Sequence, residues 1–229
     1  MTARRRRWPF DLYVLTDRGA ARGDDVYLEA LASADPGLAV QVRDAGASLP
    51  DVARRLAALQ PTARRHARPL LVGVPDRGRL TLARDALVDG VHLPERGPSV
   101  AEVRAVLGSG AWVGASVHDA TGLARRMAEG VDFVVVGPVG PVPGKGAPLS
   151  DEALADLVHA AGEVPVLALG GIRSADDVAR VVGLGAAGVA VLSRVAEHGD
   201  GAEAVRTVRR WLDDAKARVR FRDLSRASR

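Results

Sequence analysis

The feature that most constrains this chain is an alternation, repeated eight times, between short apolar runs and segments with helical spacing. The runs are rich in β-branched residues and are apolar at consecutive positions, which is typical of parallel strands buried on both faces. Alternating strands and helices predict a parallel sheet, and eight such units close a single (β/α)₈ barrel, the TIM-barrel class of α/β fold. The runs are Leu12–Leu15, Leu38–Val42, Leu70–Val74, Val91–Leu93, Trp112–Val117, Phe133–Val136, Val166–Leu169 and Val189–Leu192.

Helix start signals lie between several of these runs. Ser99 stands three residues before Glu102, which is a capping-box pattern, and Ser150 and Ser174 each precede apolar residues at helical spacing. The same alternation also fits a doubly wound open sheet, which is the alternative architecture. The barrel is favoured because eight strands are the number that closes one.

The positive charge of the chain is concentrated at its two ends. The net charge is +4, yet residues 1–7 contain four Arg and no acid and residues 216–229 carry a net +5, which leaves about −5 for residues 8–215. Basic tails bind phosphate backbones without sequence preference, and no stacking aromatics accompany these, so we expect no specific nucleic-acid partner. We assign residues 1–10 and 216–229 to basic, disordered tails, and residues 11–215 to one barrel domain.

The composition excludes several classes of protein. The chain has no cysteine, so disulfides, thiolate catalysis and Cys-based metal centres are ruled out. No apolar run reaches the roughly 18 residues that span a bilayer, and the basic start lacks the apolar region of a secretory signal. We therefore expect a cytoplasmic protein with no membrane partner. Its oligomeric state is open, and a homo-oligomer is compatible with this fold class.

Two glycines follow the seventh run, and a serine follows the eighth. Gly170 and Gly171 carry no side chain, so an anion can approach their N–H groups closely. In barrels of this type, the loops after strands seven and eight commonly form a phosphate site. The sequence therefore predicts that Gly170, Gly171 and Ser193 bind the phosphate of a small molecule.

Polar residues also stand at other predicted strand ends, where barrel enzymes place their chemistry. Gln41 and Arg43 stand at the end of the second run, and Lys145 lies in a loop rich in Pro and Gly after the sixth. We predict that these three residues bind the anionic part of the substrate. Ser116 and His118 stand at the end of the fifth run. Imidazoles titrate near neutral pH and transfer protons to and from carbon acids, so we predict that this pair is catalytic.

Eight short motifs follow one another in the order of the predicted strands. They are Tyr13–Asp17, Gln41–Arg43, Asp76–Arg77, Gly90–Leu93, Gly114–His118, Gly137–Pro138 with Lys145, Ala168–Ile172 and Val189–Ser193. In this order they resemble the thiamine phosphate synthase and thiazole tautomerase (TenI-type) family, over about residues 12–194. The resemblance implies a barrel that binds a phosphorylated thiazole, with its phosphate at the Gly170–Gly171 turn and near Ser193.

The two branches of that family need different residues. The synthase branch joins a pyrimidine pyrophosphate to the thiazole phosphate, and the departure of pyrophosphate needs Mg²⁺ and cationic or hydroxyl donors. Asp76 and Glu95 are the remaining candidate Mg²⁺ ligands in this chain. The departures from the synthase pattern are Pro75 for an Asn, Gly97 for a second Asp, Ala45 for a Lys and Val142–Gly144 for Thr-x-Thr.

The tautomerase branch needs none of that machinery. It moves a proton on a thiazole carboxylate phosphate with a His in a Ser-Val-His context, which this chain keeps at Ser116–His118. The resemblance therefore favours a tautomerase, with His118 as the acid/base, Arg43 on the substrate carboxylate and no cofactor. The alternatives are a thiamine phosphate synthase with Mg²⁺ on Asp76 and Glu95, and a non-catalytic protein that binds a thiamin precursor.

Overall fold

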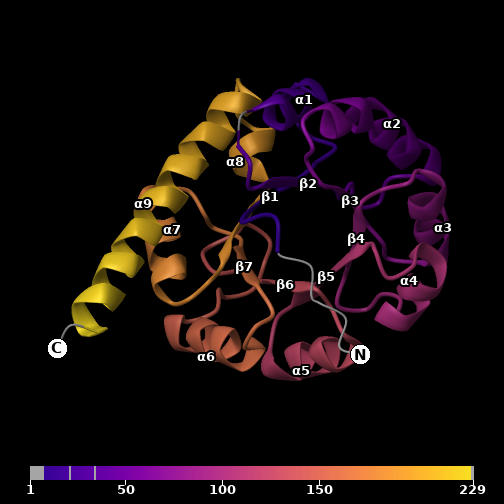
Figure 1. Ribbon diagram of the computed structural model, residues 1–229. Helices are drawn as coiled ribbons and strands as arrows, with labels where there is room; N and C mark the ends of the chain where they lie inside the picture. The colour runs from indigo at the N-terminus through magenta and orange to yellow at the C-terminus, as the bar shows by residue number, and fades with distance from the viewer. Residues whose placement is uncertain (1–7, 21, 34, 228–229) are drawn as a thin grey trace.

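The predicted alternation closes into a barrel. In the computed structural model, which describes residues 8–20, 22–33 and 35–227, eight parallel strands pair in chain order (Figure 1). Because β1 also pairs with β8, with Leu12 opposite Val189, the sheet has no edge and the open-sheet alternative is excluded. The strands are β1 (Leu12–Leu15), β2 (Leu38–Val42), β3 (Leu70–Gly73), β4 (Gly90–Leu93), β5 (Trp112–Val117), β6 (Phe133–Val136), β7 (Val166–Leu169) and β8 (Gly188–Val191).

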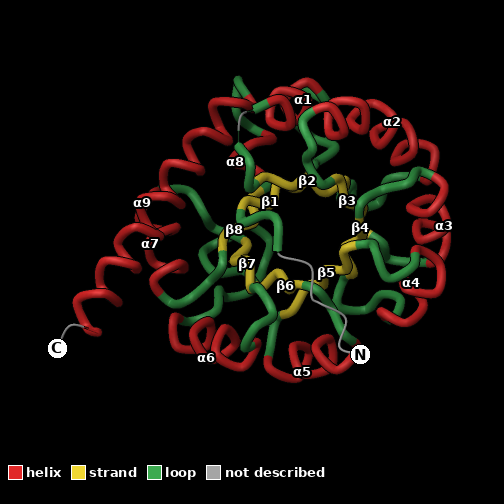
Figure 2. Tube along the Cα trace, viewed as in Figure 1, coloured by secondary structure: helices red, strands yellow, loops and turns green. Residues whose placement is uncertain are grey.

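The helices surround the strands as an outer ring (Figure 2). Ser99, Ser150 and Ser174 each cap the helix that the sequence predicts to start there. No helix in the described ranges combines the length and the apolar character needed to cross a bilayer. The helices are α1 (Asp25–Ala32), α2 (Leu49–Arg65), α3 (Arg77–Asp85), α4 (Val100–Leu107), α5 (Ala120–Glu129), α6 (Asp151–Ala161), α7 (Ala175–Gly183), α8 (Ser193–Ala196) and α9 (Gly201–Ala227).

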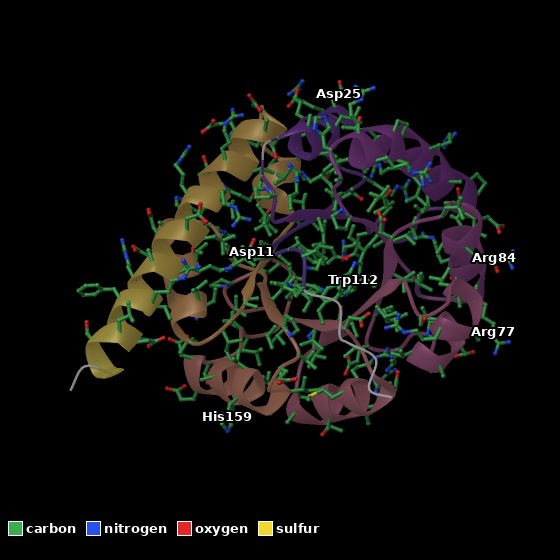
Figure 3. All side chains as sticks on the ribbon, in the orientation of Figure 1. Asp11, Asp25, Arg77, Arg84, Trp112 and His159 are labelled. Carbon is green, nitrogen blue, oxygen red and sulfur yellow. The ribbon has the colours of Figure 1, made fainter. Side chains whose placement is uncertain are left out.

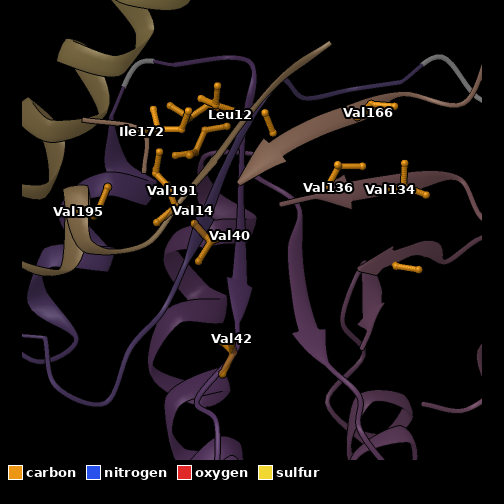
Figure 4. Close-up of a cluster of buried hydrophobic side chains, with 14 of the residues drawn as sticks. Leu12, Val14, Val40, Val42, Val134, Val136, Val166, Ile172, Val191 and Val195 are labelled. Atoms are coloured by element: carbon orange, nitrogen blue, oxygen red, sulfur yellow. The ribbon is translucent and has the colours of Figure 1, made fainter. Parts of the chain in front are cut away.

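Successive residues of each strand point alternately into the barrel and toward the helices. Val14, Val40 and Val134 belong to the outward set and pack against the helices (Figure 4). Both sets are buried, which is why the strands read as continuous apolar runs. The inward set, together with Phe10, forms a second cluster of Tyr13, Leu15, Ala39, Leu71, Trp112, Phe133, Val135, Leu167 and Ala190.

Aromatic side chains close the end of the barrel at which the strands begin. Trp112 and Phe133 are the first residues of β5 and β6, and Trp112 lies near the centre of the barrel in Figure 3. The Trp8 and Phe133 rings lie 4.7 Å apart, and those of Phe10 and Tyr13 lie 5.4 Å apart. Residues 8–10, which the sequence assigns to a disordered tail, therefore plug the barrel floor. The rest of that tail, residues 1–7, lies outside the described residues.

Helix α9 occupies the place of the eighth barrel helix, between α7 and α1 (Figure 1). Its Arg209 binds Asp35 at 2.9 Å and Asp11 at 2.5 Å, just before β1. Its Lys216 also binds Asp11. Residues 216–227, which the sequence assigns to a disordered basic tail, are instead the continuation of this helix. Beyond the predicted boundary, Val219 packs against the hydrophobic core, which holds this part of the helix to the barrel.

Candidate functional site

A cavity of about 950 Å³ opens at the end of the barrel where the strands finish. Its walls follow from the alternation of the strands, because the inward positions continue past the strand ends. Ala39 points inward on β2, so Gln41 and Arg43 also face the cavity. By the same alternation Ser116 and His118 face it from β5. Residues from distant parts of the sequence thus converge on one space.

The cavity brings together every residue that the sequence predicts for anion binding and proton transfer. Asp76 and Glu95, the predicted metal ligands, are not among the residues that line it. The roles themselves stay predictions, but their convergence is what a single substrate site requires. The predicted residues that line the cavity are Gln41, Arg43, Ser116, His118, Lys145, Gly170, Gly171 and Ser193.

The two glycines after β7 form a stretch of backbone that a residue with a side chain cannot easily replace. Their φ angles are +93° and +74°, in the region that favours glycine. A Cβ on Gly171 would lie 2.5 Å from the backbone of Gly140, and one on Gly170 would lie 3.0 Å from Pro138. Neither glycine amide donates a hydrogen bond to a residue that the structure describes. Both N–H groups are therefore available to an anion.

The helix that follows this turn uses the two amides just before it for its own cap. The carboxylate of Asp177 accepts hydrogen bonds from the backbone amides of Arg173 and Ser174, each at 2.9 Å. The Ser174 hydroxyl accepts from the amide of Asp177 in return, which completes a capping box. The amides of Arg173 and Ser174 are therefore not free to bind an anion.

His118 is held at the cavity mouth by one backbone contact. Its Nδ1 lies 2.6 Å from the carbonyl oxygen of Gly137. Because a carbonyl oxygen can only accept, Nδ1 carries the hydrogen of this bond. In the neutral ring the lone pair then sits on Nε2, and this nitrogen is free to take a proton from a bound molecule. The arrangement suits the acid/base role that the sequence predicts for His118.

His92 is a buried cavity residue that is not among the predicted site residues. Its side chain is 6% exposed, and its Nε2 lies 2.9 Å from the hydroxyl of Ser116. Burial, and then the positive charges of Arg126 and Arg43, lower the pKa of His92 to about 3. The ring is therefore neutral near pH 7 and fixes the position of Ser116. The signal that could have found His92 is its inward position on β4, two residues after Gly90.

The described cavity wall carries four cationic side chains against a single carboxylate, that of Glu197. Arg43 and Lys145 are predicted from the sequence, whereas Arg173 and Arg194 are not. Each of the latter lies one residue beyond a predicted phosphate-binding segment, which is the signal that could have found them. The excess of positive charge makes the cavity suitable for a strongly anionic ligand.

The match to known proteins covers the whole barrel. Residues 12–195 match the family model described as "Thiamine monophosphate synthase". The chain belongs to the thiamine monophosphate synthase family. It is 36% identical to a "Putative thiamine-phosphate synthase" of Geobacter sulfurreducens, over 87% of this chain and 92% of that protein. It is 35% identical to the "Thiamine-phosphate synthase" of Methanoculleus marisnigri, over 92% and 99% of the two chains.

A solved structure supports the same assignment. The "Thiamine phosphate pyrophosphorylase" of Pyrococcus furiosus superimposes with a TM-score of 0.78 at 25% identity, over 90% of this chain and 96% of that one. The chain is thus an enzyme of the thiamine monophosphate synthase family, within thiamine biosynthesis. The names of the relatives favour the synthase alternative over the tautomerase that the Ser-Val-His motif favours.

The first predicted Mg²⁺ ligand is used by a helix. Asp76 is the N-cap of α3, and its carboxylate accepts from the backbone amide of Arg79 at 2.9 Å. Helix α3 starts directly after it and turns the chain outward. The neighbouring Arg77 is 87% exposed and pairs with Glu102 of α4 at 2.9 Å, on the outer rim of the barrel (Figure 3). The Asp76–Arg77 motif therefore supports a helix start rather than the cavity.

The second predicted Mg²⁺ ligand lies in a loop that is drawn away from the cavity. Arg126 of α5 is 2% exposed and donates to the carbonyl oxygens of Pro94, at 2.7 Å, and Glu95, at 3.2 Å. Arg125 also binds the Glu95 carbonyl, at 2.7 Å. The loop after β4 is thus fastened onto α5 by its backbone, and Glu95 does not reach the cavity wall.

The metal of the synthase alternative does not fit the residues present. Among the described residues no group of three or more His, Asp or Glu side chains could hold a metal ion. The one carboxylate on the described cavity wall, Glu197, follows α8 on the opposite side of the barrel from the β3 and β4 loops. The prediction that Asp76 and Glu95 bind Mg²⁺ is not supported by their positions.

Proposed function

We propose that this enzyme is a thiamine-phosphate synthase, in which a thiazole phosphate displaces pyrophosphate from a pyrimidine pyrophosphate. The names of relatives that match over nearly their whole length support this reaction. The observation that carries the proposal is the cavity, which combines unpaired amides at Gly170 and Gly171 with four cationic side chains. Two phosphorylated substrates need such an excess of donors, because both bring negative charge into one space.

The residues of the cavity divide between the two substrates. The amides of Gly170 and Gly171, with the Ser193 hydroxyl, take the phosphate of the thiazole. Arg43 and Lys145 take the pyrophosphate and neutralise the charge that grows on it as its bond to the pyrimidine breaks. Since no pair of carboxylates from the described residues lines the cavity, we assign this neutralisation to side-chain cations and derive no step through a metal.

Gln41 and His92 supply the neutral polar surface on the cavity floor. The Gln41 side chain is 3% exposed and its Oε1 has no partner among the described residues, as is true of His92 Nδ1. Unpaired buried polar atoms are costly. They are satisfied when a polar group of the bound heterocycle, or a water that it holds, reaches them.

The tautomerase remains a second candidate because of one observation. The Gly137 carbonyl fixes the hydrogen of His118 on Nδ1 and leaves Nε2 as a base at the cavity mouth. This is the arrangement that a proton shift on a thiazole carboxylate phosphate requires, and it needs no metal.

The test is a mass-spectrometric assay for thiamin phosphate with the purified full chain, pyrimidine pyrophosphate and thiazole phosphate, with and without EDTA. Formation of product, lost on Lys145→Met, supports the synthase. Absence of product together with isomerisation of the thiazole carboxylate phosphate, abolished by His118→Gln, supports the tautomerase instead. Turnover of neither substrate set would contradict both proposals.

A further inference from the structure

Arg194 is a cation at the cavity wall that has no acidic partner among the residues that the structure describes. It lies in α8, directly after Ser193, and its side chain is half-buried. Its Nε is enclosed by the protein and has no hydrogen-bond partner within the described ranges, and no carboxylate of those ranges forms an ion pair with its guanidinium. A half-buried cation in this state is unfavourable unless something else compensates its charge.

Several other half-buried arginines of the barrel pair with carboxylates. Arg55 pairs with Asp24 at 2.5 Å, Arg180 with Asp151 at 2.5 Å, and Arg209 with Asp11 and Asp35. Arg68 and Arg79 form no ion pair with a described residue, and they donate instead to backbone carbonyl oxygens. Arg194 differs from them in lying on the cavity wall, where a ligand can supply the negative charge.

An aromatic ring holds the Arg194 side chain in place. Its guanidinium carbon lies 5.1 Å from the centroid of the Trp211 ring on α9. Trp211 itself packs against the main hydrophobic core, so its position is fixed. Stacking on an indole attracts the guanidinium and restricts its orientation, while its N–H groups stay free for a planar or tetrahedral anion. The pair is thus a cation positioned in advance at the cavity.

We propose that Arg194, positioned by Trp211, binds the phosphate group of the substrate together with Gly170, Gly171 and Ser193. The inference rests on the proposed function only in that the substrate is phosphorylated. Arg194 is the binding residue, and Trp211 is a positioning residue that acts through it. Helix α9 thereby contributes to substrate recognition although the side chain that it supplies touches no ligand.

The test uses isothermal titration calorimetry of inorganic phosphate and pyrophosphate into the full chain. Arg194→Met keeps the apolar stem and removes the charge, and we expect it to weaken phosphate binding roughly 10- to 100-fold. Arg194→Lys keeps the charge but lacks the planar guanidinium, so its affinity for phosphate should lie between those of the wild type and Arg194→Met. The matched control is Arg210→Met, next to Trp211 on the exposed side of α9 and paired with Glu203, which should bind phosphate like the wild type.

Trp211 is tested by two substitutions of different character. Trp211→Leu removes the aromatic face and should weaken phosphate binding by roughly threefold or more. Trp211→Phe keeps an aromatic face beneath the guanidinium and should bind phosphate nearly as tightly as the wild type. With phosphorylated substrate, Arg194→Met should raise KM and leave kcat nearly unchanged, since the phosphate contact is present in ground and transition states alike. Wild-type affinity in Arg194→Met, equal losses in both Trp211 variants, or no binding of phosphate by the wild type would each overturn the proposal.

The calorimetric readout separates this inference from the proposed function. If phosphate binds and depends on Arg194 while neither reaction is catalysed, the inference stands and the proposed function fails. If thiamin phosphate forms at an unchanged KM in Arg194→Met, the proposed function stands and the inference fails.

Discussion

Gly171 and Gly144 allow the strain of a positive φ angle to be separated from the cost of a steric clash. Their φ angles are +74° and +73°, but a Cβ on Gly171 would lie 2.5 Å from the backbone of Gly140, whereas one on Gly144 would meet nothing within 4 Å. A left-handed backbone costs a residue with a Cβ about 1–2 kcal/mol. Overpacking adds about 1–3 kcal/mol. We therefore expect Gly144→Ala to lower the free energy of unfolding by about 1–2 kcal/mol, and Gly171→Ala by about 2–5 kcal/mol.

The assay is urea unfolding of the two variants and the wild type, followed by circular dichroism, with a check that the denaturant slope is unchanged. The clash should also push the turn after β7 away from Gly140, so calorimetry should show weaker phosphate binding in Gly171→Ala and unchanged binding in Gly144→Ala. Equal destabilisation by the two substitutions would refute the argument, because it would mean that the turn at Gly171 is not in close contact with the backbone of Gly140.

Three further predictions follow from the contacts of single side chains. Asp76→Ala should lower the free energy of unfolding by about 0.5–2 kcal/mol through loss of the α3 cap and leave turnover unchanged; a collapse of kcat would restore Asp76 as a metal ligand. The folded pKa of His92, about 3, is depressed below the unfolded value of 6.5, so the unfolded state binds the extra proton as pH falls through 6.5 toward 3. The contribution of His92 to stability is therefore complete above pH 6.5 and falls by roughly 2 kcal/mol at pH 5. Urea titrations at pH 7 and pH 5 should show a smaller change in unfolding free energy for His92→Gln than for the wild type. An equal change in the two proteins would disprove this prediction. Arg126→Met should lower the free energy of unfolding by about 3–5 kcal/mol, because it leaves Glu129 and the Pro94 carbonyl without their partner; a loss below about 1 kcal/mol would show that water replaces the guanidinium.

The barrel was predictable because its strands are buried on both faces. Such strands read as continuous apolar runs, so the bounds of β1, β2, β5, β6 and β7 coincide with the runs in the sequence. The cavity side chains were also predictable, since Gln41, Arg43, Ser116 and His118 stand at or just past the ends of β2 and β5. The strands were thus found from their continuous apolar runs, and the cavity residues from their places at the ends of those runs.

The two predicted metal ligands lie off the cavity wall because loop directions depend on contacts between distant residues. Nothing in the sequence around Glu95 shows that Arg126, a residue in the middle of a predicted helix, is buried and fastens that loop. The sequence around Asp76 is compatible with a metal ligand or with a helix cap. In the structure Asp76 caps α3, which begins at the next residue. The tails were misjudged for a related reason: charge suggested disorder, while Phe10 and Val219 were apolar enough to pack.

The bonds between α9 and the start of β1 have a consequence for how the chain reaches its native state. Arg209 and Asp11 are 198 positions apart in the sequence. The sheet keeps a free edge until β8 pairs with β1. On the ribosome, β1 therefore emerges long before its second strand partner and before the helix that covers it. During that interval the nascent sheet presents an unpaired edge, which is the surface that chaperones protect and through which incomplete chains aggregate.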